Sequence, residues 1–191
     1  MKARDNPFST DRILQVRYRL PGALTWEQFL QRFETMNRRA AIVGPEGSGK
    51  TTLLEDAEER LRQRGWATRR AGLTRERRCL ARAQWNELLG GLDAGTIVLF
   101  DSADLLGALA WRRLTRGAKP AGGLLVTTHG RELLPVLHRC ETSPVLFHAI
   151  LRQLLSEEEI RSLQFDPAAM FRRHGGNIRE ALREMYDRFA Q

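Results

Sequence analysis

The sequence has little lysine, little cysteine and no long apolar run, and the last two shortages each exclude a class of protein. Only three of the 31 basic residues are lysines, namely Lys2, Lys50 and Lys119. The two cysteines, Cys79 and Cys140, are too few and too far apart for a disulfide framework or a metal site. No stretch approaches the roughly 18 apolar residues that a membrane span needs. We therefore expect a cytoplasmic protein with reduced thiols and no membrane partner.

The chain is basic because of arginine, and this excess of charge has two interpretations. The 191 residues carry a formal net charge of +8, and the arginines are densest at 69–82 and 112–116. They either replace lysine on a solvated surface or form a face that attracts nucleic acid or an acidic protein. No zinc-knuckle, aromatic-rich ribonucleoprotein or helix-turn-helix pattern indicates sequence readout.

In one eight-residue segment, the glycines, the lysine and the threonine each have a physical role in binding phosphate. It is Gly44-Pro45-Glu46-Gly47-Ser48-Gly49-Lys50-Thr51, which matches the phosphate-loop pattern G-x-x-x-x-G-K-[ST]. The glycines let backbone N–H groups converge on a β-phosphate, Lys50 reaches the β- and γ-phosphates, and the Thr51 hydroxyl ligates Mg²⁺. Thr52 follows in the same turn and completes the predicted binding set. ATP is the expected nucleotide, because the N-K-x-D motif of guanine-specific proteins is absent from the sequence.

The flanking residues suit this loop. Residues 39–43, apolar after Arg39, predict a short buried strand. Residues 51–61 predict a helix with Leu53, Leu54, Ala57 and Leu61 on its buried side. A helix that begins at the loop directs its partial positive charge at the phosphates.

The chain as a whole predicts an α/β fold with three layers and three segments. Residues 1–38 form an extension that packs on the core, residues 39–152 the nucleotide-binding core, and residues 153–191 a helical lid. The core is expected to hold a mostly parallel sheet of about five strands, at 39–43, 66–71, 96–100, 123–128 and 144–150.

Capping patterns predict where several helices begin. Thr25 and Gln28 suit a helix from Trp26, and Ser156-Glu157-Glu158-Glu159, Asp166-Pro167 and Asn177 suit three helices of the lid. In the extension, Asn6-Pro7-Phe8 either packs near the adenine or anchors the N-terminus on the sheet.

A second motif, Thr96-Ile97-Val98-Leu99-Phe100-Asp101, is an apolar strand that ends in a carboxylate. It predicts a Walker B site in which Asp101 holds Mg²⁺ beside Thr51, and the alternative is a strand whose Asp caps a helix. The next residue is Ser102 and not the glutamate that would orient an attacking water, so efficient hydrolysis is not expected. Asp104 either replaces that glutamate or caps a helix that continues through Leu105, Leu106 and Leu109.

A third strand, 123–128, ends in Thr128-His129. These polar groups can sense the γ-phosphate or hold the nucleophilic water from the neighbouring strand end. The alternative for His129 is the cap of the next helix.

With these motifs in place, the chain resembles the additional-strand P-loop NTPases, and within them the AAA+ ATPases and their signalling relatives. Gly175-Gly176-Asn177-Ile178-Arg179-Glu180-Ala181-Leu182 is similar to the sensor 2 pattern, which implies that Arg179 is the lid arginine. The resemblance also implies that Thr128 and His129 occupy the sensor 1 site and that Arg139, or the nearby Arg131, is an arginine finger. The usual second region of homology is not recognisable.

These residues predict a Mg-ATP-binding ATPase with slow intrinsic hydrolysis and nucleotide-dependent switching. It would bind ATP and ADP, and a homo-oligomer or a larger protein partner would complete its site. Two alternatives remain open. One is a small-molecule or nucleoside kinase, and the other is a nucleic-acid-binding protein regulated by ATP.

Overall fold

The computed structural model describes residues 6–13, 15–162 and 166–190, and these fall into two compact units. The sheet unit consists of residues 18–44 and 50–140. The helical unit consists of the described residues up to Arg17, residues 45–49 and the described residues from Glu141 onward. Each unit is described separately.

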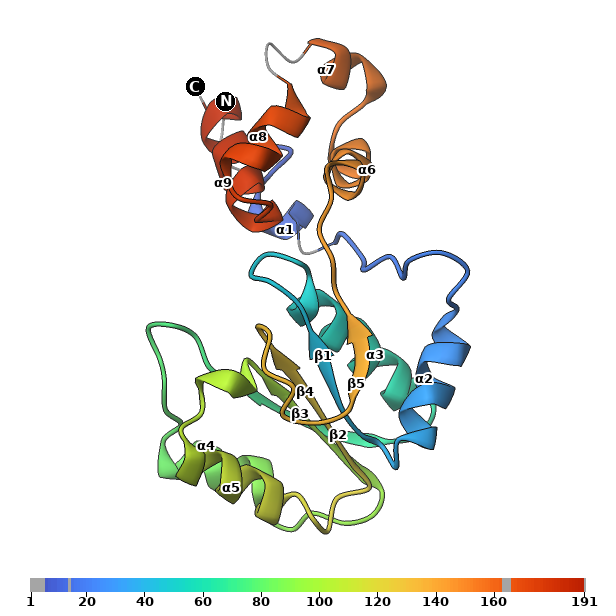
Figure 1. Ribbon diagram of the computed structural model, residues 1–191, viewed down its shortest axis with the longest axis vertical. Coiled ribbons are helices and arrows are strands. Elements are labelled where there is room, and N and C mark those ends of the chain that lie inside the picture. The colour runs from blue at the N-terminus through green and yellow to red at the C-terminus, as the bar shows by residue number, and fades with distance from the viewer. Residues whose placement is uncertain (1–5, 14, 163–165, 191) are drawn as a thin grey trace. The chain divides into compact units, whose positions relative to one another are not determined.

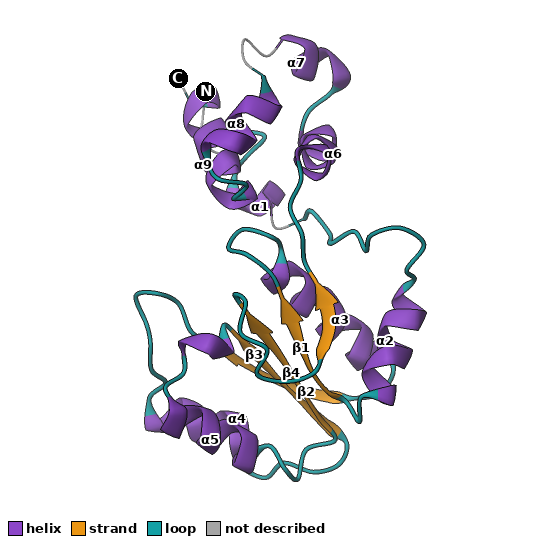
Figure 2. Ribbon diagram, in the orientation of Figure 1, coloured by secondary structure: helices purple, strands orange, loops and turns teal. Residues whose placement is uncertain are grey.

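The sheet unit is built on a five-stranded parallel sheet in the order β2-β3-β4-β1-β5 (Figure 2). The strands are β1 (Arg39–Val43), β2 (Ala67–Gly72), β3 (Thr96–Asp101), β4 (Gly123–Thr128) and β5 (Val136–Arg139). The three-layer α/β fold with a parallel sheet is confirmed. In this order β2 and β5 are the edge strands.

Helices cover both faces of the sheet (Figure 1). α2 (Trp26–Thr35) and α3 (Lys50–Gln63) pack on one face, and α4 (Arg82–Leu89) and α5 (Ala108–Gly117) pack on the other. Because side chains alternate along a strand, Ile97 and Leu99 face α3 while Val98 and Phe100 face α4 and α5. A strand covered on both faces needs apolar residues along its buried length, and the four residues between the ends of β3, 97–100, are all apolar.

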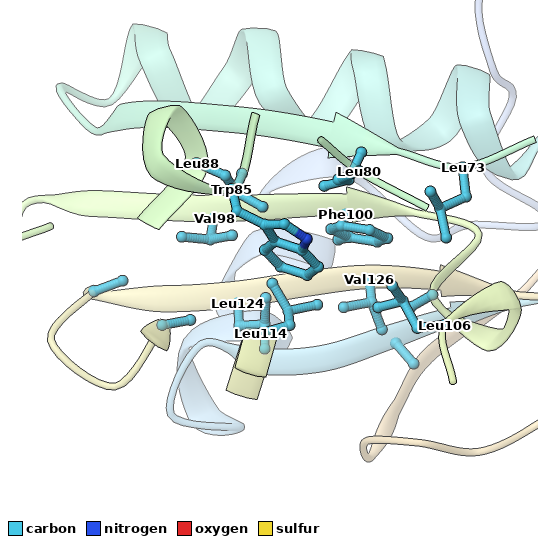
Figure 3. Close-up of a cluster of buried hydrophobic side chains, with 14 of the residues drawn as sticks. Leu73, Leu80, Trp85, Leu88, Val98, Phe100, Leu106, Leu114, Leu124 and Val126 are labelled. Atoms are coloured by element: carbon cyan, nitrogen blue, oxygen red, sulfur yellow. The ribbon is translucent and has the colours of Figure 1, made fainter. Parts of the chain in front are cut away.

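The core beneath α4 and α5 centres on an indole. Figure 3 shows Trp85 of α4 over the strands, close to Phe100, and the two rings stack with centroids 6.3 Å apart. Trp85 is 6% exposed and Phe100 is fully buried. This cluster fixes α4 against the sheet beside the edge strand β2.

On the other face, the expected local signals are confirmed. The side chains of Leu53, Leu54, Ala57 and Leu61 are buried, as the helix pattern predicted for α3. Thr25 accepts a hydrogen bond from the Gln28 N–H, and the Gln28 side chain accepts one from the Thr25 N–H. This capping box starts α2.

The strand expected at 144–150 is wrong, because these residues belong to the helix α6 (Pro144–Leu154). The apolar run was compatible with either element, but Ser143 caps the segment, proline occupies its first turn, and Phe147, Leu151 and Leu154 form a buried helical stripe. The fifth strand is β5, whose short and partly polar sequence gives no strand pattern of its own.

The helical unit contains α1 (Thr10–Ile13), α6, α7 (Glu157–Ser162), α8 (Pro167–Arg173) and α9 (Ile178–Phe189). The predicted caps are confirmed at Ser156, Asp166 and Asn177. Phe8 packs among these helices, and its ring centroid lies 5.1 Å from that of Phe189. In the described residues, no helix combines the length and apolar character needed to cross a membrane.

Candidate functional site

The Asp101 carboxylate lies at the carboxyl end of β3 and is held from two directions. The Thr51 hydroxyl, in the first turn of α3, donates a hydrogen bond to Asp101 Oδ2 over 2.8 Å. The hydroxyl of Thr127, on the neighbouring strand β4, donates to Asp101 Oδ1, and the Ser102 N–H donates to Thr127 Oγ1 over 2.8 Å. Parallel strands place their carboxyl ends at one edge, where ligands of open α/β sheets bind.

Two neighbours of Asp101 were missed by sequence reasoning. Thr127 is fully buried, and only its position one residue before the noted Thr128 could have indicated a role. Gly72 lies opposite Asp101 in the β2–β3 register, and a Cβ on Gly72 would lie 2.8 Å from the Asp101 Cβ. The missing side chain at position 72 leaves room for the carboxylate.

The phosphate loop has the backbone that its sequence requires. Gly47 and Gly49 have φ values of +75° and +82°, a region that favours glycine. The Ser48 hydroxyl donates to the Pro45 carbonyl oxygen over 2.8 Å, which closes the turn. Lys50 is the first residue of α3 and only 6% exposed. An ammonium group and a helix N-terminus at a glycine loop fit a polyphosphate.

The oxygen donors also fit a magnesium ion. Mg²⁺ is usually held by one or two carboxylates together with substrate phosphates and water. The Thr51 hydroxyl and the Asp101 carboxylate, already 2.8 Å apart, form such an oxygen pair. Across the described ranges no group of three or more His, Cys, Asp or Glu residues gathers as a metal cluster, so an ion here would depend on ligands from the nucleotide.

Asp104 and His129 form a pair beside this site. Asp104 lies in the 3-10 helix η2 (Ala103–Leu105), and its Oδ2 is 3.1 Å from His129 Nδ1. The helix expected to run through Leu105, Leu106 and Leu109 is wrong, because α5 begins only at Ala108 with Gly107 as its cap. Asp104 therefore does not cap a helix that runs through these leucines. His129 does not cap a following helix either, because the chain after it leads into β5.

The predicted sensor 1 residue Thr128 and the predicted arginine finger Arg139 both bond to groups of the sheet unit other than Asp101. The Thr128 side chain is fully buried, and its hydroxyl donates to the Arg131 carbonyl oxygen over 2.7 Å. Arg139 ends β5 and forms an ion pair with Glu132, in which both side chains are 55% exposed. Thus Thr127, and not Thr128, binds Asp101.

In the helical unit, the tip of the phosphate loop meets the start of α9. The Asn177 side chain accepts a hydrogen bond from the Glu180 N–H over 3.2 Å, and a Cβ on Gly47 would overlap Asn177 Oδ1. Arg179 follows in the first turn of α9 and is exposed. Close approach to the cap is therefore a second reason for glycine at position 47.

Cys140, directly after β5, has a buried and unreactive thiol. Burial raises the pKa of the Cys140 thiol to about 11, although a hydrogen bond with Tyr18 and the charge of Lys50 act in the opposite direction. The thiol therefore remains protonated at neutral pH.

Comparisons with solved structures show which known fold this chain shares. The RuvB Holliday junction branch migration motor of Thermotoga maritima matches with a TM-score of 0.56 and 17% identity, over 91% of this chain and 64% of that one. NtrX of Brucella abortus, solved in complex with ATP, matches with a TM-score of 0.54 and 14% identity, over 89% of this chain and 50% of that one. This is the AAA+ P-loop NTPase fold.

The likeness to AAA+ proteins is structural. No family model and no curated protein sequence matches the chain. The chain spans less than two thirds of the length of RuvB and half of NtrX. The AAA+ fold is thus established for this chain, and its own activity has to be argued from its residues.

Proposed function

We propose that this protein binds Mg-ATP, hydrolyses it slowly, and changes the packing of its helical unit with the state of the nucleotide. The observation that carries the proposal is the hydrogen bond from Thr51 to Asp101, which joins the residue after the phosphate-loop lysine to the end of β3. A hydroxyl and a carboxylate in this relation are the magnesium-binding pair of P-loop ATPases.

The residues divide the work of binding. The backbone N–H groups of residues 44–51 and the Lys50 ammonium hold the phosphates, and Thr52 belongs to the same helical turn. Thr51 and Asp101 hold Mg²⁺, and Thr127 holds Asp101 in position. An ion held by these two residues would neutralise part of the phosphate charge.

Slow hydrolysis follows from the residues beside Asp101. Ser102 offers no carboxylate to orient a water molecule, and Asp104 is engaged by His129. Both carboxylate oxygens of Asp104 lie within 3.2 Å of His129 Nδ1, so Asp104 can accept a proton from water only after this contact opens, and we assign both residues to the catalytic step. In this proposal Thr128 supports the same strand end through its bond to Arg131.

Switching rests on the contact between Gly47 and Asn177 in the helical unit. A triphosphate that reorganises the backbone of the loop would move the cap of α9 and, with it, Arg179. We propose Arg179 as the γ-phosphate sensor on this helix.

A neighbouring copy would complete the site through Arg139. This side chain is exposed, but Glu132 holds its guanidinium, so it has to leave that ion pair to reach another subunit. An arginine finger can raise hydrolysis by roughly 10³ to 10⁵. Turnover per subunit should then rise with concentration in the natural protein and stay flat in Arg139→Ala.

Calorimetric titration with ATP, with and without magnesium, tests the binding proposal. Lys50→Ala should lose most of its affinity for the triphosphate, because its ammonium group is removed from a buried position. Lys119→Ala, which removes an exposed lysine outside the loop, is the matched control and should bind normally. Unchanged affinity in Lys50→Ala would contradict the site.

A further inference from the structure

The edge strand β2 borders a basic groove that the nucleotide site does not use. The groove is a cavity of about 700 Å³, lined by the consecutive strand residues Thr68–Gly72 on one side and by α4 and the loop before it on the other. Its floor is apolar and includes Ala71, Leu80 and Leu88. The buried cluster around Trp85 packs α4 against the sheet beside this groove (Figure 3).

Alternate backbone groups of β2 face the outside of the sheet. The Ala67 N–H donates to the Gly95 oxygen and the Leu73 N–H to the Asp101 oxygen, which sets the odd-numbered residues toward β3. By the alternation of a parallel ladder, the N–H and C=O groups of Thr68 and Arg70 point away from β3. In the described parts of the chain no residue hydrogen-bonds to these outward groups.

The charged side chains that line the groove are mostly positive. Three arginines line it, Arg69, Arg70 and Arg77, against a single carboxylate, Glu87. Arg70 is compensated by Glu55 and Glu58 on the α3 side. The guanidinium groups of Arg69 and Arg77 instead bind backbone carbonyl oxygens, at Glu87 and Gly90 and at Gly72. Among the described residues neither of these two guanidinium groups forms an ion pair with a carboxylate, so no ion pair neutralises their charges.

We propose that this groove docks an acidic segment of a partner protein in extended conformation, added to the sheet as a strand beside β2. The backbone of the segment pairs with Thr68 and Arg70, apolar side chains rest on the floor, and carboxylates approach Arg69 and Arg77. Repeating backbone donors and acceptors match a peptide. A nucleic acid strand would need stacking surfaces, and no aromatic side chain lines the groove.

The probe is a fluorescein-labelled peptide of alternating glutamate and valine, six residues long, measured by fluorescence anisotropy with the full chain. We expect saturable binding that Arg77→Glu weakens about tenfold, whereas Arg112→Glu, an equal charge change on the exposed side of α5, alters it less than about twofold. The same peptide methylated at every backbone nitrogen keeps its charges and should not bind, because it cannot pair with an edge strand.

Amide hydrogen exchange gives a second readout. Bound peptide should slow exchange at Thr68 and Arg70, while Arg69 and Ala71 are already protected by β3. The proposal is overturned if the methylated peptide binds equally well, or if exchange at Thr68 and Arg70 does not change. It is also overturned if a twelve-thymidine oligonucleotide displaces the peptide and Arg77→Glu and Arg112→Glu weaken peptide binding equally.

Discussion

Thr51 donates its hydroxyl hydrogen to Asp101 over 2.8 Å, although 50 residues separate them in the chain. The bond connects the first turn of α3 to the carboxyl end of β3, beside the phosphate loop. Thr51 closes the phosphate-loop motif, and Asp101 closes the apolar strand motif of residues 96–101. The magnesium site that we propose depends on their meeting at one strand edge.

Replacing Asp101 by asparagine should affect magnesium more than the nucleotide. The amide oxygen can still accept from Thr51, so the fold is kept, but the negative charge is lost. We expect the apparent affinity for Mg²⁺ in the presence of ATP to fall at least about tenfold, equivalent to roughly 1.4 kcal/mol. Binding of ATP measured in a chelator should hardly change. Equal loss under both conditions would contradict a role centred on the ion.

Replacing Thr127 by valine should both destabilise the protein and disturb Asp101. The hydroxyl is fully buried, donates to Asp101 and accepts from the Ser102 N–H. Its removal leaves buried groups unpaired, at about 1–3 kcal/mol of unfolding free energy. Denaturant unfolding and a magnesium titration measure the two effects. Thr115→Val, which loses a bond to the Trp111 carbonyl oxygen on α5, should leave the magnesium titration unchanged.

Gly72→Ala tests whether the space beside Asp101 is needed. The new methyl group would lie 2.8 Å from the Asp101 Cβ, so the strands or the carboxylate have to shift. We expect a loss of about 1–3 kcal/mol in stability and weaker magnesium-dependent binding. Gly107→Ala places its methyl group in open space and is the control. Normal magnesium dependence in Gly72→Ala would show that Asp101 tolerates crowding.

Glu184→Gln should destabilise the helical unit, relative to the natural protein, more at neutral pH than in acid. Hydrogen bonds from His174 and then Arg188 lower the pKa of the Glu184 carboxyl below 4.5, with further help from Arg173. A lowered pKa means that the ionised group stabilises the fold above about pH 4.5, and that this stabilisation is lost as pH falls through the lowered value.

Thermal unfolding across pH measures this effect. For such a partly exposed cluster we expect a difference of about 0.5–1 kcal/mol at pH 7, shrinking in acid. The exposed Glu180, on the same helix, provides the matched control Glu180→Gln. A difference between natural protein and Glu184→Gln that stays constant down to pH 3 would argue against the carboxylate as its source.

The motifs whose meaning depends on near neighbours could be predicted from the sequence. The phosphate loop and the caps at Thr25, Ser156 and Asn177 depend on interactions within a few residues. The strands at 39–43 and 123–128 pair with each other, but runs of apolar residues mark both in the sequence. Backbone conformation and hydrogen bonding at such distances are set by residue type, so the pattern predicts the structure.

The elements that needed a distant partner could not be predicted in this way. β5 is a strand because it pairs with β1, and the apolar run at 144–150 becomes a helix whose buried stripe packs on α8. The bond from Thr127 to Asp101, the space left by Gly72 and the groove along β2 likewise arise only when separate strands come side by side. Local sequence decides what a segment can become, whereas burial against the rest of the chain selects among those forms, because most of the stabilising free energy comes from that burial.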